Sequence, residues 1–153
     1  MDKTIRCLQS LFDQSVLCFE LSIKVYLVDD GSTDGTSDSI RSQFPEVYII
    51  QGNGSLYWNR GMHLAWKTAA AAKDFDYYLW LNDDTFLFDN AILEMLSYSV
   101  NSDTIISGPT KSKINNECTY GGYINESLVL PNGTFQTIHH FNGNCVLIPK
   151  RVF

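Results

Sequence analysis

The sequence has little charge, and its basic residues form no cluster. Only 18% of the residues are charged, and 11 lysines and arginines stand against 17 aspartates and glutamates, for a net charge of −6. Nucleic-acid-binding proteins usually gather Lys and Arg on one face, so we expect no nucleic-acid partner. No apolar run is long enough to span a bilayer, and the sequence therefore predicts no transmembrane helix.

The sequence also lacks the cysteine spacing of a metal-binding motif. Its four cysteines are scattered along the chain, at Cys7, Cys18, Cys118 and Cys145. We expect all four to be reduced thiols. The expected location is the cytoplasm, with a peripheral association with the membrane left open.

What is present indicates an α/β fold. With 153 residues, 44% of them hydrophobic, the chain is long enough for one domain with a core. Strands are predicted at 23–28, 47–50, 77–81, 104–107 and 145–148. Helical spacing of apolar residues predicts helices around 5–12, 40–44, 62–69 and 92–100. This alternation predicts a mostly parallel central sheet with helices on both faces.

The segment 77–85 contains the clearest candidate site. Tyr77–Leu81 is a run of large apolar residues, typical of a strand buried on both faces. Asn82, Asp83 and Asp84 follow where this strand ends. Adjacent carboxylates repel each other, and oxygen-rich acidic clusters suit Mg²⁺ or Mn²⁺. The alternative is a solvated turn or helix cap without a ligand.

A second acidic strand end comes earlier, at Asp29 and Asp30. They follow the predicted strand 23–28 and begin a turn rich in Gly, Ser and Asp. In nucleotide-binding folds, acidic residues at such positions accept hydrogen bonds from a base or a ribose hydroxyl. We expect both acidic clusters at the same edge of one sheet, because ligands bind at the carboxyl ends of parallel strands. An ordinary Asx turn is the alternative at Asp29 and Asp30.

Four segments together resemble family 2 glycosyltransferases with the GT-A fold. Residues 28–36 (VDDGSTDGT) resemble the family signature, and 81–85 (LNDDT) its metal-binding "DxD" segment in the form typical of rhamnosyltransferase-like members. Residues 52–62 (GNGSLYWNRGM) are similar to the loop and helix between those motifs, and 141–149 (FNGNCVLIP) to the acceptor-side strand. The resemblance covers nearly the whole chain. It implies a GT-A-like domain over 1–153, with a nucleotide-sugar-binding part (1–109) and an acceptor-side part (110–153).

The resemblance implies transfer of a sugar from a nucleoside diphosphate sugar to a hydroxyl, with inversion. The acceptor would be a saccharide or a lipid-linked compound, in bacterial-type polysaccharide or glycan synthesis. Asp84 would coordinate Mg²⁺ or Mn²⁺, supported by Asp83 and Asn82. The residues implied at the donor are Asp29, Asp30, Asn59, Arg60 and Asp83. The residues implied at the acceptor are Asn142, Gly143 and Asn144.

The sequence departs from the family pattern in three places. Many members carry Arg where Trp58 stands, so Trp58 packs on the donor or belongs to the core, and Arg60 is a candidate for the missing cation. The family's first strand and its C-terminal acidic segment have no counterpart, and the general base is expected beyond Phe153. We therefore expect an incomplete domain that does not turn over alone, with an open edge at 23–28 that favours a homodimer.

Two other functions fit part of the pattern. A receiver-like signalling domain also gathers carboxylates and Mg²⁺ at strand ends, with Asp84 as its phosphoacceptor. Lys150 lies too close to the end to serve as the late lysine of such a domain. A non-catalytic nucleotide- or sugar-binding remnant of a transferase is the second alternative.

Overall fold

The computed structural model describes residues 1–17, 21–100 and 102–152, with side chains for the same residues apart from 15–17. It forms two compact units, Met1–Phe75 and Asp76–Phe153, which are described separately here. The division into a nucleotide-sugar part (1–109) and an acceptor part (110–153) concerns function and stays a prediction. Among the described residues, Cys7, Cys118 and Cys145 form no disulfide, and Cys18 lies outside these residues.

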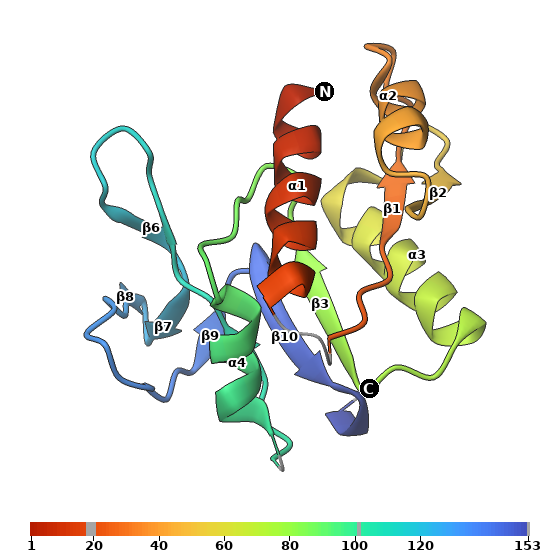
Figure 1. Cartoon of the computed structure of the whole chain (residues 1–153). Coiled ribbons are helices and arrows are strands. Elements are labelled where there is room, and N and C mark those ends of the chain that lie inside the picture. Colours follow the sequence, from red (N-terminus) through yellow and green to blue (C-terminus); the bar gives the residue numbers. More distant parts are fainter. Residues whose placement is uncertain (18–20, 101, 153) are drawn as a thin grey trace. The chain divides into compact units, whose positions relative to one another are not determined.

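The first unit is built on two parallel strands. Its elements are α1 (Asp2–Leu17), β1 (Tyr26–Asp29), α2 (Thr36–Gln43), β2 (Tyr48–Gln51) and α3 (Tyr57–Ala72). β1 and β2 run side by side, with Tyr26 opposite Tyr48 and Asp29 opposite Gln51 (Figure 1). Parallel neighbours need a crossover, which α2 supplies. The ends of both strands therefore point the same way, and the turn after β1 lies beside the loop after β2.

Ile40 is the centre of the first unit's core. It is fully buried and packs with Leu8, Phe44 and Val47, from α1 and from the segment that leads into β2. Phe12 adds a ring stacked on Phe44, with 5.7 Å between the ring centroids. Helix α1 continues to Leu17, beyond the helix predicted around 5–12, and β1 begins three residues later than predicted.

The second unit is built around its last strand. Its elements are β3 (Tyr77–Leu81), α4 (Ala91–Ser99), β4 (Ile106–Ser107), β5 (Thr110–Lys111), β6 (Cys118–Tyr120), β7 (Gly122–Ile124), β8 (Ser127–Leu128), β9 (His140–Phe141), β10 (Cys145–Pro149) and the 3₁₀ helix η1 (Lys150–Val152). β10 lies between β3 and β4, and all its residues are buried. Met95 of α4 packs with Ile106, Cys145 and Leu147 beneath this sheet.

The mostly parallel central sheet is not confirmed. Parallel pairing is present between β1 and β2, but β10 runs antiparallel to both β3 and β4. The residues between β4 and β10 return the chain so that β10 enters from the opposite end. An apolar run predicts a buried strand, but it carries no information on the strand's direction.

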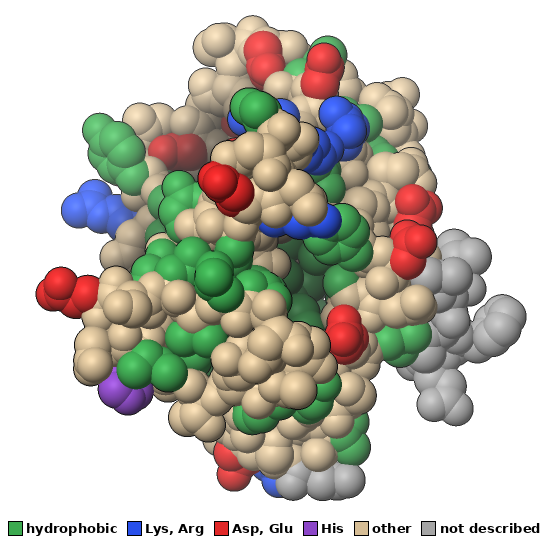
Figure 2. Space-filling view, turned by 90° about the vertical axis from the view of Figure 1, so that its left-hand side faces the viewer, with side chains coloured by type: hydrophobic (Ala, Val, Ile, Leu, Met, Phe, Trp, Pro, Cys, Tyr) green, Lys and Arg blue, Asp and Glu red, His purple; other side chains and the backbone are tan. Residues whose placement is uncertain are grey.

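Small hairpins fill the stretch between β4 and β10. β5 pairs with β6, and β7 pairs with β8 and β9. Figure 2 faces the side of the molecule on which these hairpins lie in Figure 1, and shows hydrophobic side chains at the surface among polar atoms. The exposed large hydrophobic residues between β5 and β10 are Ile114, Tyr120, Ile124, Leu130, Phe135 and Phe141.

Candidate functional site: two acidic turns

Asp29 is held inside its own turn. Its side chain closes the end of β1 and is only 5% exposed. One carboxylate oxygen accepts a hydrogen bond from the Ser32 N–H at 2.8 Å, and the other accepts one from the Ser37 hydroxyl. Burial acts to raise the pKa of Asp29, but the hydrogen bonds from Ser37 and Ser32 outweigh it and lower the pKa. These contacts agree with the Asx-turn alternative, and a donor-binding role for Asp29 stays a prediction.

Asp30 connects its turn to the loop that follows β2. Oδ1 accepts a hydrogen bond from the Gly54 N–H at 2.7 Å. Oδ2 accepts two more, from the N–H groups of Leu56 at 2.7 Å and Tyr57 at 3.2 Å. Desolvation acts to raise the pKa of Asp30, yet these backbone donors, Leu56 first, lower it below its usual value.

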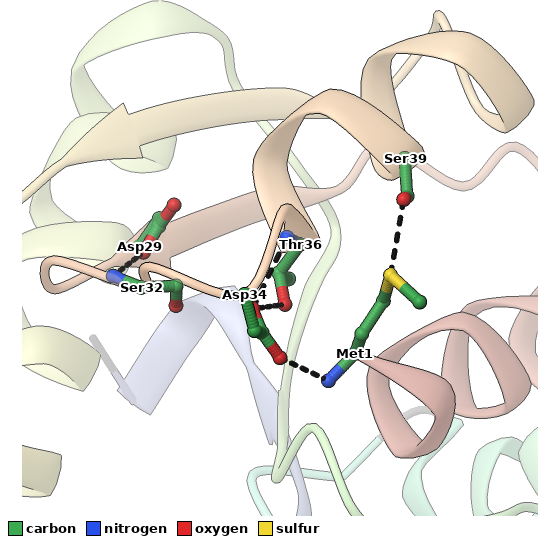
Figure 3. A network of polar contacts seen from close by, with 6 residues as sticks. All are labelled: Met1, Asp29, Ser32, Asp34, Thr36 and Ser39. Carbon is green, nitrogen blue, oxygen red and sulfur yellow. Dashed lines mark hydrogen bonds and ion pairs between the residues drawn. The ribbon is translucent and has the colours of Figure 1, made fainter.

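Asp34 anchors the start of α2 (Figure 3). Its Oδ1 accepts hydrogen bonds from the Thr36 hydroxyl at 2.5 Å and the Thr36 N–H at 3.2 Å. Its Oδ2 lies 2.9 Å from the ammonium group of Met1, whose sulfur accepts a hydrogen bond from Ser39. The hydrogen bond from Thr36 and that from the ammonium group lower the pKa of Asp34 to about 2.

The first turn of α3 presents four exposed side chains in sequence. Tyr57, Trp58, Asn59 and Arg60 all lie at the surface. Trp58 is 47% exposed, so the interpretation of this residue as part of the core is wrong. The helix begins at Tyr57, which places Asn59 inside the first turn and not at the cap.

The turn after β3 is held by an asparagine pair. The N–H of Asn82 donates to the Asn144 carbonyl, and the two side-chain amides are joined by a second hydrogen bond, both at 3.0 Å. The Thr85 N–H donates back to the Asn82 carbonyl at 3.0 Å and closes the turn. Asp83 and Asp84, at the middle of this turn, are exposed. The structure thus joins a residue predicted beside the metal to one predicted at the acceptor.

The other predicted acceptor residues lie between β9 and β10. The Asn142 N–H donates to the Gly121 carbonyl at 3.1 Å. Among the described residues, the buried Oδ1 of Asn142 has no hydrogen-bond partner. Gly143 separates it from Asn144, and both are half-buried.

A protein-family model shows which family the chain belongs to. The model described as Glycosyl transferase family 2 matches residues 2–153. The chain belongs to glycosyl transferase family 2. No curated protein and no solved structure matches it. Family 2 membership gives the α/β fold of the GT-A type and glycosyltransferase activity with nucleotide sugars at the level of the family. It leaves the receiver-like alternative without support.

The metal predicted for this family 2 protein fits the residues present. Asp83 and Asp84 offer exposed carboxylates next to each other, the hard oxygen ligands that Mg²⁺ and Mn²⁺ prefer. Over residues 1–17, 21–100 and 102–152, no group of three or more His, Cys, Asp or Glu side chains is placed to hold a metal ion. Mg²⁺ is commonly bound through one or two carboxylates together with substrate phosphates. The donor set therefore suits a metal that is shared with a diphosphate.

The two acidic turns of the family 2 domain belong to different sheets. Asp29 and Asp30 end a strand of the β1–β2 sheet, whereas Asp83 and Asp84 follow β3 in the antiparallel sheet. The prediction that both lie at the edge of one sheet is not confirmed. It relied on one mostly parallel sheet containing all these strands, whereas β1 pairs with β2 and β3 pairs with β10.

Sequence reasoning missed the contacts of Asp30 with the loop after β2. A signal was available, because Gly52 and Gly54 are spaced as in a loop that approaches another backbone segment closely.

No helix in the described ranges is both long and apolar enough to cross a bilayer.

Proposed function

We propose that this family 2 protein transfers a sugar from a nucleoside diphosphate sugar to a hydroxyl group, with inversion and with a divalent metal. The acceptor is a saccharide or a lipid-linked compound in polysaccharide or glycan synthesis. The observation that carries the proposal is the turn at Asn82–Asp84. Its two carboxylates are exposed, and its geometry is fixed by the hydrogen bonds to Asn144.

On the donor side, the residues assigned to the nucleotide belong to the first unit. Asp29 and Asp30 lie where β1 ends, and Asn59 and Arg60 lie on the exposed first turn of α3. Arg60 offers a guanidinium group that matches a phosphate in charge and geometry. In this proposal Arg60 replaces the arginine that many members carry at the position of Trp58.

On the metal side, Asp84 is the direct ligand, and Asp83 and Asn82 support it. A bound Mg²⁺ or Mn²⁺ supplies charge that stabilises the departing diphosphate. Asp83 and Asp84 keep two negative charges at the surface, where a diphosphate alone is repelled. Asn82 holds the turn in place through Asn144, so the two carboxylates need little reorganisation when the ligand arrives.

On the acceptor side, Asn142, Gly143 and Asn144 lead into β10. Asn142 and Gly143 border the acceptor, and Asn144 is committed to Asn82. Any shift of this segment on acceptor binding is therefore transmitted to the turn that carries Asp83 and Asp84.

Calorimetry with UDP, dTDP and GDP tests the proposal, each with Mn²⁺ and with EDTA. At least one nucleotide should bind in Mn²⁺ and lose most of its affinity in EDTA or with Asp84→Ala. Glu126→Ala removes another exposed acid of the same unit and should bind as the parent does. If Asp84→Ala binds the nucleotides as well as the parent does, both in Mn²⁺ and in EDTA, the metal site at Asp84 is excluded.

A second assay separates a transferase from a binding remnant. It measures the nucleoside diphosphate released from nucleotide sugars in the presence of candidate acceptors. Metal-dependent release with sugar transfer supports the enzyme, and binding without release under all conditions supports the remnant.

A further inference from the structure

The chain contains three Asn-Gly steps, which begin at Asn53, Asn132 and Asn142. In such a step the backbone nitrogen of the glycine can attack the side-chain carbonyl carbon of the asparagine. Glycine favours this ring closure, because it has no Cβ atom to obstruct the approach and its backbone is the most adaptable. The structure places the three steps in different surroundings, and these surroundings distinguish their reactivity.

The first two steps share one local conformation. Both asparagines are exposed, and the glycines that follow them have φ +81° and +79°. Oδ1 of Asn132 accepts hydrogen bonds from the Thr134 N–H at 3.0 Å and from the Thr134 hydroxyl at 2.7 Å. Oδ1 of Asn53 accepts the same two bonds from Ser55, at 3.1 Å and 2.8 Å. The chain thus contains a matched pair of Asx turns.

These hydrogen bonds favour attack on the asparagine side chain. They fold the side chain back towards the peptide group that follows it. They also direct two donors at Oδ1, the oxygen on which negative charge develops when a nitrogen adds to Cγ. Donors placed in this way stabilise the transition state. By this criterion alone, Asn53 and Asn132 would react equally fast.

The glycine nitrogens distinguish the two turns. The Gly54 N–H donates to Oδ1 of Asp30 at 2.7 Å. This nitrogen must lose its proton in order to attack, and a carboxylate that accepts its hydrogen bond favours the protonated form. No described residue accepts a hydrogen bond from the Gly133 N–H, and a Cβ atom at Gly133 would have nothing within 4 Å. The attacking nitrogen is therefore restrained in the first turn and not in the second.

The third step lies where the chain is held by its neighbours. The Asn142 N–H donates to the Gly121 carbonyl at 3.1 Å, and Oδ1 of Asn142 is buried. Gly143 is half-buried and leads into β10, all of whose residues are buried. Ring closure needs rotation of the side chain and access for water, so Asn142 should react more slowly than Asn132.

We propose that Asn132, in the loop between β8 and β9, is a site of spontaneous deamidation, and that Asp30 protects Asn53 from the same reaction (Figure 1). The Gly133 nitrogen loses its proton to solvent and forms a bond to Cγ of Asn132. The bond from Cγ to the side-chain nitrogen breaks, and ammonia leaves with a proton from solvent. Water then adds to either carbonyl of the cyclic imide and opens the ring. The product is aspartate or isoaspartate, with one water consumed and nothing oxidised or reduced.

The reaction introduces charge into an uncharged loop. Residues 127–138 contain no Asp, Glu, Lys, Arg or His. Leu130 and Phe135, on either side of Asn132, are 64% and 50% exposed. The aspartate product keeps an acceptor for both hydrogen bonds from Thr134, whereas the isoaspartate product lengthens the main chain by one carbon atom. Both products place a negative charge between two exposed apolar side chains.

Ageing of the folded protein in mildly alkaline buffer tests the proposal, with peptide mapping by mass spectrometry as the readout. Asn132 should deamidate about 10- to 100-fold faster than Asn53, the ratio expected when one reaction must first release a hydrogen bond to a charged acceptor. In urea-unfolded protein the two turns lose their surroundings and should react at about equal rates. Asn132→Gln keeps the amide but needs a larger ring, so it should acquire less acidic product in isoelectric focusing.

A variant of the first turn tests the protection. Asp30→Ala removes the acceptor of the Gly54 N–H and should raise the rate at Asn53 towards that at Asn132, whose own rate should not change. A cooperative melting curve shows that this variant is folded, and the comparison of folded with unfolded parent does not depend on it.

Equal rates at Asn53 and Asn132 in the folded parent would overturn the proposal, as would unmodified Asn132 after the unfolded protein has reacted. An unchanged rate at Asn53 in folded Asp30→Ala would overturn the protection by Asp30. These measurements involve no nucleotide, so their outcome is independent of the proposed function.

Discussion

The two acidic turns of this chain use the same kind of residue in opposite ways. In the first unit, Asp29 and Asp30 accept five hydrogen bonds from neighbouring backbone and hydroxyl groups. In the second unit, Asp83 and Asp84 are exposed, and the asparagine beside them fixes the turn. Hydrogen bonds to a carboxylate stabilise its charge without a cation. Carboxylate pairs that look alike in sequence therefore differ in what they offer a ligand.

If the proposed function is right, the carboxylates of the first turn have an architectural role and those of the second turn bind the ligand. Losing a carboxylate in the first unit should loosen local structure, whereas losing one in the second should leave the fold intact and affect metal and nucleotide.

The largest expected effect is on metal binding at the second turn. Asp83→Ala removes a supporting group and should weaken Mn²⁺ binding in the presence of UDP by about tenfold, within the 10- to 100-fold typical of such groups. Asp84→Ala removes the proposed direct ligand and should weaken Mn²⁺ binding by more than that. Mn²⁺ titrations followed by calorimetry measure both. A larger loss for Asp83→Ala would reverse the two roles, and unchanged affinity in both would remove the metal from this turn.

Asp29→Ala should produce the largest change in stability of any acidic substitution in the two turns. It leaves the Ser32 N–H and the Ser37 hydroxyl without their acceptor, at a cost of about 1–3 kcal/mol in the free energy of unfolding. Asp83→Ala, at an exposed position, should change it by less than about 0.5 kcal/mol. Urea unfolding measures the stability of both variants. Equal shifts of the two unfolding midpoints would contradict the different roles of the two turns.

The asparagine pair should contribute a smaller, measurable coupling. Asn82→Ala and Asn144→Ala each remove the side-chain hydrogen bond and should cost about 0.5–1.5 kcal/mol. In a double-mutant cycle the second change should cost less than it does alone, because the contact is already lost. Additive costs would mean that the amides do not stabilise the turn together.

The smallest expected effect is on the stability of the fold at low pH. The pKa of Asp34 is about 2 in the folded protein, below its ordinary value of 3.8. The ionised form is thus favoured by folding, so its contribution is fully present above pH 4 and is lost as the pH falls from about 4 to about 2. Asp34→Asn should flatten the stability profile in this window. An unchanged profile would mean that the contacts with Thr36 and Met1 do not hold in solution.

Much of the fold could be predicted from local pattern. The strand at Tyr77–Leu81 lies where its apolar run predicts it, and the helices α1, α2, α3 and α4 all exist. The direction of β10 could not be predicted, because burial on both faces is the same for a parallel and an antiparallel strand. Which strands share a sheet also depends on contacts between distant residues, and those leave no local periodicity.

The candidate site shows the same limit. Asn82 and Asn144 were both singled out, but their hydrogen bond joins residues 62 positions apart. The commitment of Asp30 to the loop depends on the absence of a side chain at Gly52, because a Cβ atom there would lie 2.4 Å from the Asp30 Oδ1. Residue type identified the polar groups, and only three-dimensional placement decides which are already engaged.

The central position of β10 has a consequence for the newly made chain. β3 pairs with β10, so this pairing can form only after the ribosome has added β10. Asn82 and Asn144, which connect the ends of these two strands, are 62 positions apart. At about 5–20 residues per second, β3 waits about 3–12 s for its partner. Throughout that interval the apolar strand Tyr77–Leu81 is unpaired. Its free edge can then pair with another nascent chain or bind a chaperone. Translation speed across the hairpins therefore sets how long the second unit stays vulnerable to aggregation.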